Sequence, residues 1–123
     1  MIKLSRESFE RLVQQALEDL PEEFAARLEN VAVVVEEEPD AKVLRDMGLD
    51  PEEEADELFG LYLGTPLIER DSGYADVPDR IAIYMGPILR SCRSAREVVR
   101  EIRNTVIHEI GHHFGLSDEE MPY

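Results

Sequence analysis

Cysteine is nearly absent from this sequence, and so are the features of a membrane protein. The 123 residues include one cysteine, Cys92, so no disulfide can form within the chain. No apolar run approaches the roughly 20 residues that cross a bilayer. Residues 1–5 lead directly into an amphipathic pattern without a visible signal peptide. These absences predict a cytoplasmic protein with no membrane association, and Cys92 is interpreted as a packing residue because no metal-spaced partner cysteine exists.

Basic residues are also few. The chain has 13 lysines and arginines against 28 aspartates and glutamates, which gives a formal net charge of −15. Nucleic acid is therefore not an expected partner, because its phosphates would be repelled. The acidic runs at 36–38 and 52–54 are most simply solvated surface, and the alternative is that they favour cationic substrates or partners.

The length and the hydrophobic pattern predict one domain over residues 1–123 with a modest core. Apolar spacing and capping residues predict helices at 5–20, 21–30, 40–47 and 94–114. Short apolar runs predict strands at 31–35, 58–63 and 80–85. The run at 31–35 is continuous, as expected for a strand covered on both faces. Residues 65–79 are predicted to form a long loop that borders the functional cleft, because long loops in small domains are often functional. The order of elements predicts an α/β or α+β arrangement, with helices packed on a small sheet.

The most informative residues form an HExxH motif, His108-Glu109-Ile110-Gly111-His112. Positions i and i+4 share a helix face, so His108 and His112 can hold one metal ion. Glu109 is about 100° away, where a general base for a bound water belongs. Gly115 can end the helix in the left-handed conformation, and Asp118 could then supply a third ligand.

The helix that carries this motif is predicted to begin at Ser94, which forms a capping box with Glu97. Its apolar residues fall on one arc of the helix and are Val98, Val99, Ile102, Val106, Ile110 and Phe114. His108 and His112 fall nearly opposite that arc, with Glu101 and Thr105 as residues that could orient a histidine. His113 lies inside the arc and is interpreted as a core or supporting histidine rather than a ligand.

The third ligand has competing candidates, because Asp118, Glu119 and Glu120 all follow Gly115 closely. The spacing favours Asp118, since Leu116 can pack back on the core and return the next residues toward the histidine face. The alternative for Asp118 is a turn residue that bonds its own backbone.

At this motif and with this order of elements, the chain resembles a family of small bacterial zincin-like metallopeptidases, often described as minimal zincins. The resemblance is specific over residues 106–118 and looser elsewhere. It implies Zn²⁺ held by His108, His112 and Asp118, with Glu109 as the catalytic base. It also implies a single-domain mixed sheet of about three to four strands, with the metal-binding helix near the C-terminus. The edge strand beside the cleft, to which a peptide could pair, is predicted at 81–85.

The expected activity is zinc-dependent hydrolysis of peptide bonds in a peptide or protein substrate. Tyr74, Tyr84 and Tyr123 are candidates to stabilise the oxyanion, although each is more often structural. The alternative is a zincin-fold binding or regulatory module that holds metal and turns over little. Glu109 favours the enzyme, and the absence of a C-terminal subdomain after the motif favours the module. Hydrolysis of a non-peptide amide would use the same chemistry.

Overall fold

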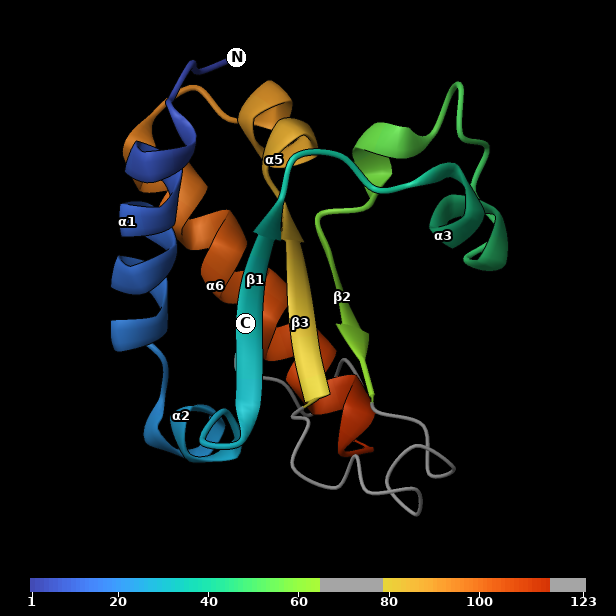
Figure 1. Ribbon diagram of the computed structural model, residues 1–123. Helices are drawn as coiled ribbons and strands as arrows, with labels where there is room; N and C mark the ends of the chain where they lie inside the picture. Colours follow the sequence, from blue (N-terminus) through green and yellow to red (C-terminus); the bar gives the residue numbers. More distant parts are fainter. Residues whose placement is uncertain (65–78, 116–123) are drawn as a thin grey trace.

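The computed structural model describes residues 1–64 and 79–115, in which most of the helices pack on one face of a three-stranded sheet (Figure 1). The elements in chain order are α1 (Arg6–Glu18), α2 (Glu22–Arg27), β1 (Val31–Glu36), α3 (Ala41–Asp46), the short 3-10 helix η1 (Ala55–Glu57), β2 (Gly60–Leu63), β3 (Asp79–Tyr84), α5 (Met85–Ser91) and α6 (Ala95–His113). The predicted α+β fold class, with the motif helix last among the described elements, is confirmed.

The sheet is mixed and has the strand order β1-β3-β2. β3 pairs in parallel with β1 and antiparallel with β2. The prediction that residues 81–85 form an edge strand is therefore wrong, because β3 is the central strand. Its residues Ile81, Ala82 and Ile83 are 0% exposed, since neighbouring strands cover both edges and apolar side chains pack on both faces.

β1 is an edge strand, and the prediction that its apolar run is covered on both faces holds in part, because apolar clusters pack on both faces while the outer edge stays accessible. Four of its six residues are only half-buried, whereas Val35 is buried and Glu36 is exposed. A continuous apolar run predicts a buried strand, but it does not say which strand takes the central position. The order of the strands in the sheet decided that β3, rather than β1, is the fully buried one.

The two faces of the sheet carry separate apolar clusters. Ile81 and Ile83 of β3 point to the face covered by α1, α5 and α6, while Ala82 and Tyr84 point to the face covered by α3 and the segment around Leu58. Figure 1 shows α1 and α6 side by side on the first face and α3 on the opposite side. Among the described helices, none is both long and apolar enough to span a bilayer.

Two helices begin with side-chain capping hydrogen bonds. The Ser5 side chain accepts from the backbone N–H of Ser8 at 3.1 Å and begins α1. Asp40 accepts from the N–H groups of Lys42 and Val43 at 2.8 and 3.2 Å and begins α3. Gly48 follows α3 with φ of 78°, a left-handed conformation that glycine adopts without a Cβ clash. These helix starts and stops depend on local residues, and for that reason the sequence predicted them.

Helix α5 was not predicted. It follows β3 directly, and Pro87 lies in its first turn, where the missing N–H of proline breaks no helical hydrogen bond. Its apolar residues Ile88 and Leu89 are buried, and Cys92 immediately after it is 1% exposed, which confirms Cys92 as a packing residue. Burial raises the pKa of the Cys92 thiol, so this side chain stays protonated and packs as an apolar group.

Strand β2 passes very close to α6 at Gly60. A Cβ at this position would lie 2.6 Å from Cγ2 of Thr105 in α6 and 2.8 Å from the backbone oxygen of Ala82 in β3. Both separations are far below van der Waals contact, and the Ala82 oxygen belongs to the central strand and cannot easily move. Glycine at residue 60 therefore allows the sheet edge and the motif helix to pack against each other.

We predict that Gly60→Ala lowers the free energy of unfolding by about 1–3 kcal/mol, the usual cost of forcing an extra group into a packed interior. Gly64→Ala is the matched control, because the atom nearest to a Cβ there is 3.9 Å away. Chemical denaturation of both variants measures the difference. Equal stability of the two variants would contradict close packing at Gly60.

Candidate functional site

Helix α6 is fixed at its start and along one face, which leaves its motif residues on the other side. The Ser94 side chain accepts from the backbone N–H of Glu97 at 3.2 Å, and the Glu97 carboxylate accepts from the N–H of Arg93 at 2.7 Å. The predicted capping box is thus formed, with Glu97 reaching the residue before the cap. The buried residues of the helix are Val98, Val99, Ile102, Val106, Ile107, Ile110 and Gly111. His108 and Glu109 are half-buried, and His112 is exposed.

His108 is oriented by its own helix. Its Nδ1 atom lies 2.8 Å from the backbone oxygen of Asn104, one turn earlier. A carbonyl oxygen only accepts hydrogen bonds, so Nδ1 carries the proton and donates it. In the neutral imidazole, Nε2 then keeps its lone pair. Nε2 is therefore the atom of His108 that can bind a metal ion.

The imidazole rings of His108 and His112 lie close together on α6. Their ring centroids are 6.1 Å apart, and the ring planes are inclined by 60°. This places two nitrogen ligands of the type that zinc prefers on one side of the helix, as the i, i+4 spacing predicts.

Glu109 contacts the edge of the sheet. Its Oε1 atom accepts a hydrogen bond of 2.9 Å from the backbone N–H of Tyr62 in β2. The N–H of Tyr84 bonds to the carbonyl of Phe59, so alternation along β2 turns the N–H of Tyr62 away from β3. The candidate base is thus held at the outer edge of β2, in place of the edge predicted at 81–85.

Tyr62 joins three elements around this contact. Its ring stacks on His113 of α6, with centroids 3.9 Å apart and planes inclined by 16°. Its hydroxyl group donates to Asp79 at the start of β3, at 2.8 Å. Sequence reasoning missed Tyr62, Asp79 and Asn104, because no local pattern distinguishes a strand tyrosine beside a motif helix from any other.

His113 and Phe114 do not belong to the core, which corrects the predicted apolar arc. His113 is exposed and stacks on Tyr62, and its ring meets that of Phe114 edge-on at 5.1 Å. Phe114 is 49% exposed and follows the last residue of α6, with the guanidinium of Arg27 5.1 Å from its ring centroid. The prediction from the apolar arc is wrong at these two residues because the buried residues of α6 end at Gly111, and the helix extends past the core.

Tyr84 is not a donor at this site. It is 1% exposed and packs with Leu44 and Leu58 on the face of the sheet opposite α6. Burial, followed by the charge of Glu36, raises the pKa of its hydroxyl group. The other two oxyanion candidates, Tyr74 and Tyr123, lie outside the described residues.

The two residues predicted to orient a histidine have other surroundings. Thr105 packs against Gly60 through its methyl group. Glu101 precedes His108 by two helical turns, roughly 10 Å. It lies closer to Cys92, where its negative charge is the second cause, after burial, of the raised pKa of the thiol. The carbonyl of Asn104 orients His108 instead.

The third predicted ligand, Asp118, lies outside the described residues, as do Glu119 and Glu120. Within residues 1–64 and 79–115, no three ligating side chains gather into a metal-binding group. Gly115 has a φ of 85°, which confirms the left-handed end predicted for the motif helix. Of the predicted loop at 65–79, only Asp79 is described, and it bonds to Tyr62.

Comparison with known proteins places the chain in a family. A family model described as zincin-like metallopeptidase matches residues 28–123, which include β1, the whole sheet and α6. A solved structure of a conserved hypothetical protein from T. thermophilus is similar, with 29% identity and a TM-score of 0.57 over 89% of this chain and 94% of that chain. No curated protein matches. The match to the family model covers most of the chain, so this protein belongs to the zincin-like metallopeptidase family.

Proposed function

We propose that this protein is a zinc-dependent peptidase that cleaves an extended segment of a peptide or protein substrate beside strand β2. His108, His112 and Asp118 would hold the metal, and Glu109 would act as the general base. The family supports a metallopeptidase type of site with a metal cofactor. The assignment of individual residues is the further step.

The described residues fit zinc in their chemistry. His108 and His112 offer imidazole nitrogens on one side of α6, and the bond from Nδ1 of His108 to Asn104 leaves Nε2 available. Two imidazoles and one carboxylate form a three-ligand set of the kind found in catalytic zinc sites. When bound, zinc supplies a Lewis acid and lowers the pKa of a coordinated water to about 7.

The observation that carries the proposal is the contact between Glu109 and the edge of β2. The Glu109 carboxylate lies 2.9 Å from the backbone N–H of Tyr62, so the candidate base stands where a peptide pairing with that edge would pass. From there Glu109 can take a proton from an attacking water and return it to the leaving amine. A site that only stored metal would have no need of a carboxylate at a strand edge.

A second candidate function is a metal-binding module with little turnover. The same contact favours it in part, because the Glu109 carboxylate is already engaged by the N–H of Tyr62. A module of this kind would bind zinc through the two histidines but would cleave no member of a peptide library, whether or not Glu109 is intact.

We further propose that the protein works in the cytoplasm. The single cysteine supports this location, because Cys92 is a buried thiol.

We predict that the protein binds about one equivalent of zinc and that His108→Ala/His112→Ala abolishes this binding, because two of the three ligands are removed. His113→Ala is the matched control and should keep its zinc, since His113 stacks on Tyr62. Metal analysis after dialysis against stoichiometric zinc measures the content. Full zinc loading of the double variant would contradict the assignment of His108 and His112 as ligands.

Glu109→Gln should keep zinc and lose about 100-fold or more in cleavage rate, the scale of general-base catalysis. The glutamine carbonyl can still accept from the N–H of Tyr62, so the fold should be preserved. Glu101→Gln is the control on the same helix and should retain its rate. Cleavage of a proteome-derived peptide library gives the readout, and undiminished turnover in Glu109→Gln would place the chemistry elsewhere.

Asp118→Ala should weaken zinc affinity by about tenfold or more. Removing a residue that only hydrogen-bonds to a ligand already costs about tenfold in metal affinity, and a ligand should cost at least as much. Glu119→Ala and Glu120→Ala should leave the affinity unchanged. Competition with a zinc chelator measures all three variants. A neutral Asp118→Ala together with a weakened Glu119→Ala or Glu120→Ala would move the third ligand without removing the zincin site.

A further inference from the structure

The second edge of the sheet, on β1, has backbone groups with no hydrogen-bond partner among the described residues. Because Tyr84 bonds to β2, the odd-numbered residues of β3 bond to β1, and the odd-numbered residues of β1 face outward. Two of these outward groups form hydrogen bonds with described residues. Arg6 donates to the backbone oxygen of Val35, and the N–H of Val31 donates to the backbone oxygen of Leu28 at 3.0 Å. The C=O of Val31, both groups of Val33 and the N–H of Val35 remain at the edge. An unprotected edge of this kind is a template for an added strand.

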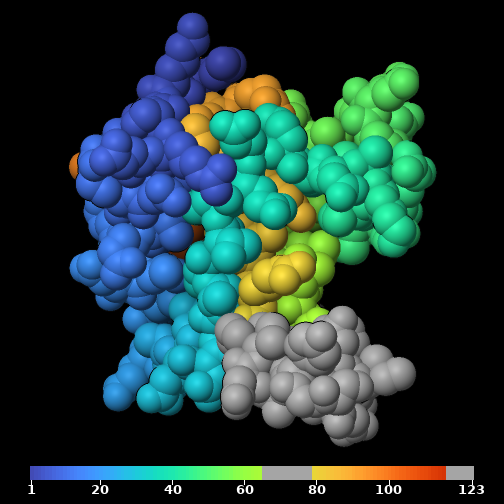
Figure 2. Space-filling model, viewed as in Figure 1, coloured from blue at the N-terminus to red at the C-terminus, as the bar shows by residue number. Residues whose placement is uncertain are grey.

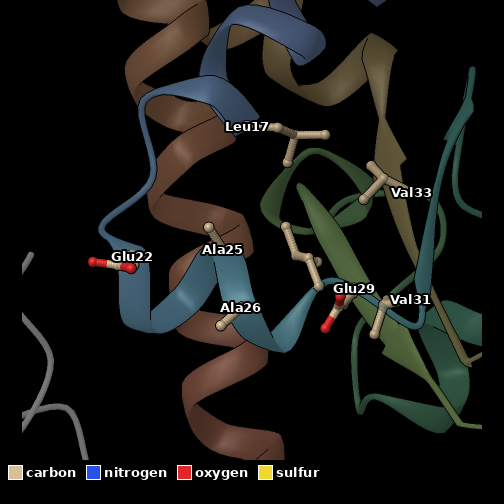
Figure 3. A pocket seen from close by; sticks show the side chains of 8 residues that line it. Leu17, Glu22, Ala25, Ala26, Glu29, Val31 and Val33 are labelled. Carbon is tan, nitrogen blue, oxygen red and sulfur yellow. The ribbon is translucent and has the colours of Figure 1, made fainter.

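A groove runs along this edge, between β1 and the helices α1 and α2. Its larger part is a hollow of about 720 Å³, and an adjoining hollow of about 350 Å³ shares Leu17 and Val33 with it. Figure 3 shows Val31 and Val33 of β1 on one side of the larger hollow, and Leu17 of α1 with Ala25 and Ala26 of α2 across from them. In Figure 2, β1 reaches the surface beside α1. Small and branched apolar walls next to free backbone groups suit an extended peptide.

The rim of the groove is acidic. Glu22 and Glu29 line the larger hollow, and Glu10 lines the smaller one. Arg6 is the cation in the smaller hollow, and it lies 3.9 Å from Glu10 while it caps the oxygen of Val35. The chain as a whole carries a formal charge of −15. Acidic groups at both ends of an apolar groove favour a segment with cationic ends and an apolar middle.

We propose that β1 and this groove bind an extended, cationic segment of a partner protein, which adds as a strand parallel or antiparallel to β1. The segment would pair with Val33, place alternate apolar side chains against Leu17 and Val33, and direct lysines or arginines to Glu22, Glu29 and Glu10. The surface lies on the edge of the sheet opposite β2, so this docking does not depend on the proposed peptidase activity.

The probe is a labelled heptapeptide, Lys-Lys-Val-Thr-Val-Lys-Lys, in which residues one, three, five and seven share a face of the strand. Fluorescence anisotropy at low ionic strength measures its binding to the full chain. Of two versions methylated at alternate backbone nitrogens, the version whose methyl groups face β1 should bind at least several-fold more weakly, and the other should bind normally. A version with glutamates for lysines should also bind more weakly. Amide hydrogen exchange should slow at Val33 and Val35 when the parent peptide binds.

Two protein variants test the groove. Glu22→Lys/Glu29→Lys should weaken binding by about threefold or more, the scale of two exposed ion pairs at low salt. Glu52→Lys/Glu53→Lys makes the same change in net charge away from the groove and should have less than half of that effect. Ala25→Phe fills the hollow from an exposed helix position and should also weaken binding. Glu109→Gln should bind the peptide as well as the parent protein does.

Four results would overturn the proposal. An equal loss in the two charge variants would show attraction by net charge alone. Undiminished binding of both methylated peptides would exclude strand pairing. A dimer that Ala25→Phe dissociates, seen by light scattering, would make a second copy of this chain the occupant. Binding that disappears in His108→Ala/His112→Ala would place the peptide at the metal site.

Discussion

The close packing of α6 against β2 is the constraint on which the candidate site depends. Gly60 has no Cβ, so Thr105 and the central strand can approach the backbone of β2. Two residues further along β2, the N–H of Tyr62 then reaches Glu109 at 2.9 Å. A larger residue at 60 would hold the helix and the strand apart, and the candidate base would no longer stand at a strand edge. The close packing at Gly60 therefore positions the carboxylate of Glu109 against β2.

Helix α6 separates its structural and chemical roles by face. Its apolar residues, from Val98 to Ile110, fix the helix against the sheet and α1, while the polar side presents His108, Glu109 and His112. The tautomer of His108 is set within the helix by the carbonyl of Asn104. The proton on the imidazole is therefore determined locally, whereas the environment of Glu109 is determined by a strand 47 residues away in the sequence. This difference explains why a helical motif predicts which side chains share a helix face better than it predicts the surroundings of those side chains.

The two edges of the sheet have different surroundings. At β2, the motif helix supplies a carboxylate to an outward N–H, and the ring of Tyr62 is fixed by His113 and Asp79. At β1, the surroundings are an apolar groove with carboxylates at its rim, and a single arginine caps one carbonyl. The first edge combines backbone groups with a candidate reaction centre, and the second combines them with apolar and electrostatic recognition. Within the described residues, the two edges of the sheet are therefore surrounded by different chemistry.

The sequence alone determined the features that depend on neighbours along the chain. Ser5 and Ser94 predicted helix starts through their side-chain oxygens, Gly115 predicted a left-handed helix end, and the i, i+4 spacing placed His108 and His112 together. The same motif led to the family that comparison confirmed. Tertiary structure decided the rest. It made β3 central and β1 an edge, buried Tyr84 away from α6, exposed His113 and brought Tyr62 to Glu109. Capping and helical spacing act over one turn and are written in adjacent residues, whereas strand order and contacts across the sheet join residues far apart, for which apolar runs of similar composition give no distinguishing signal.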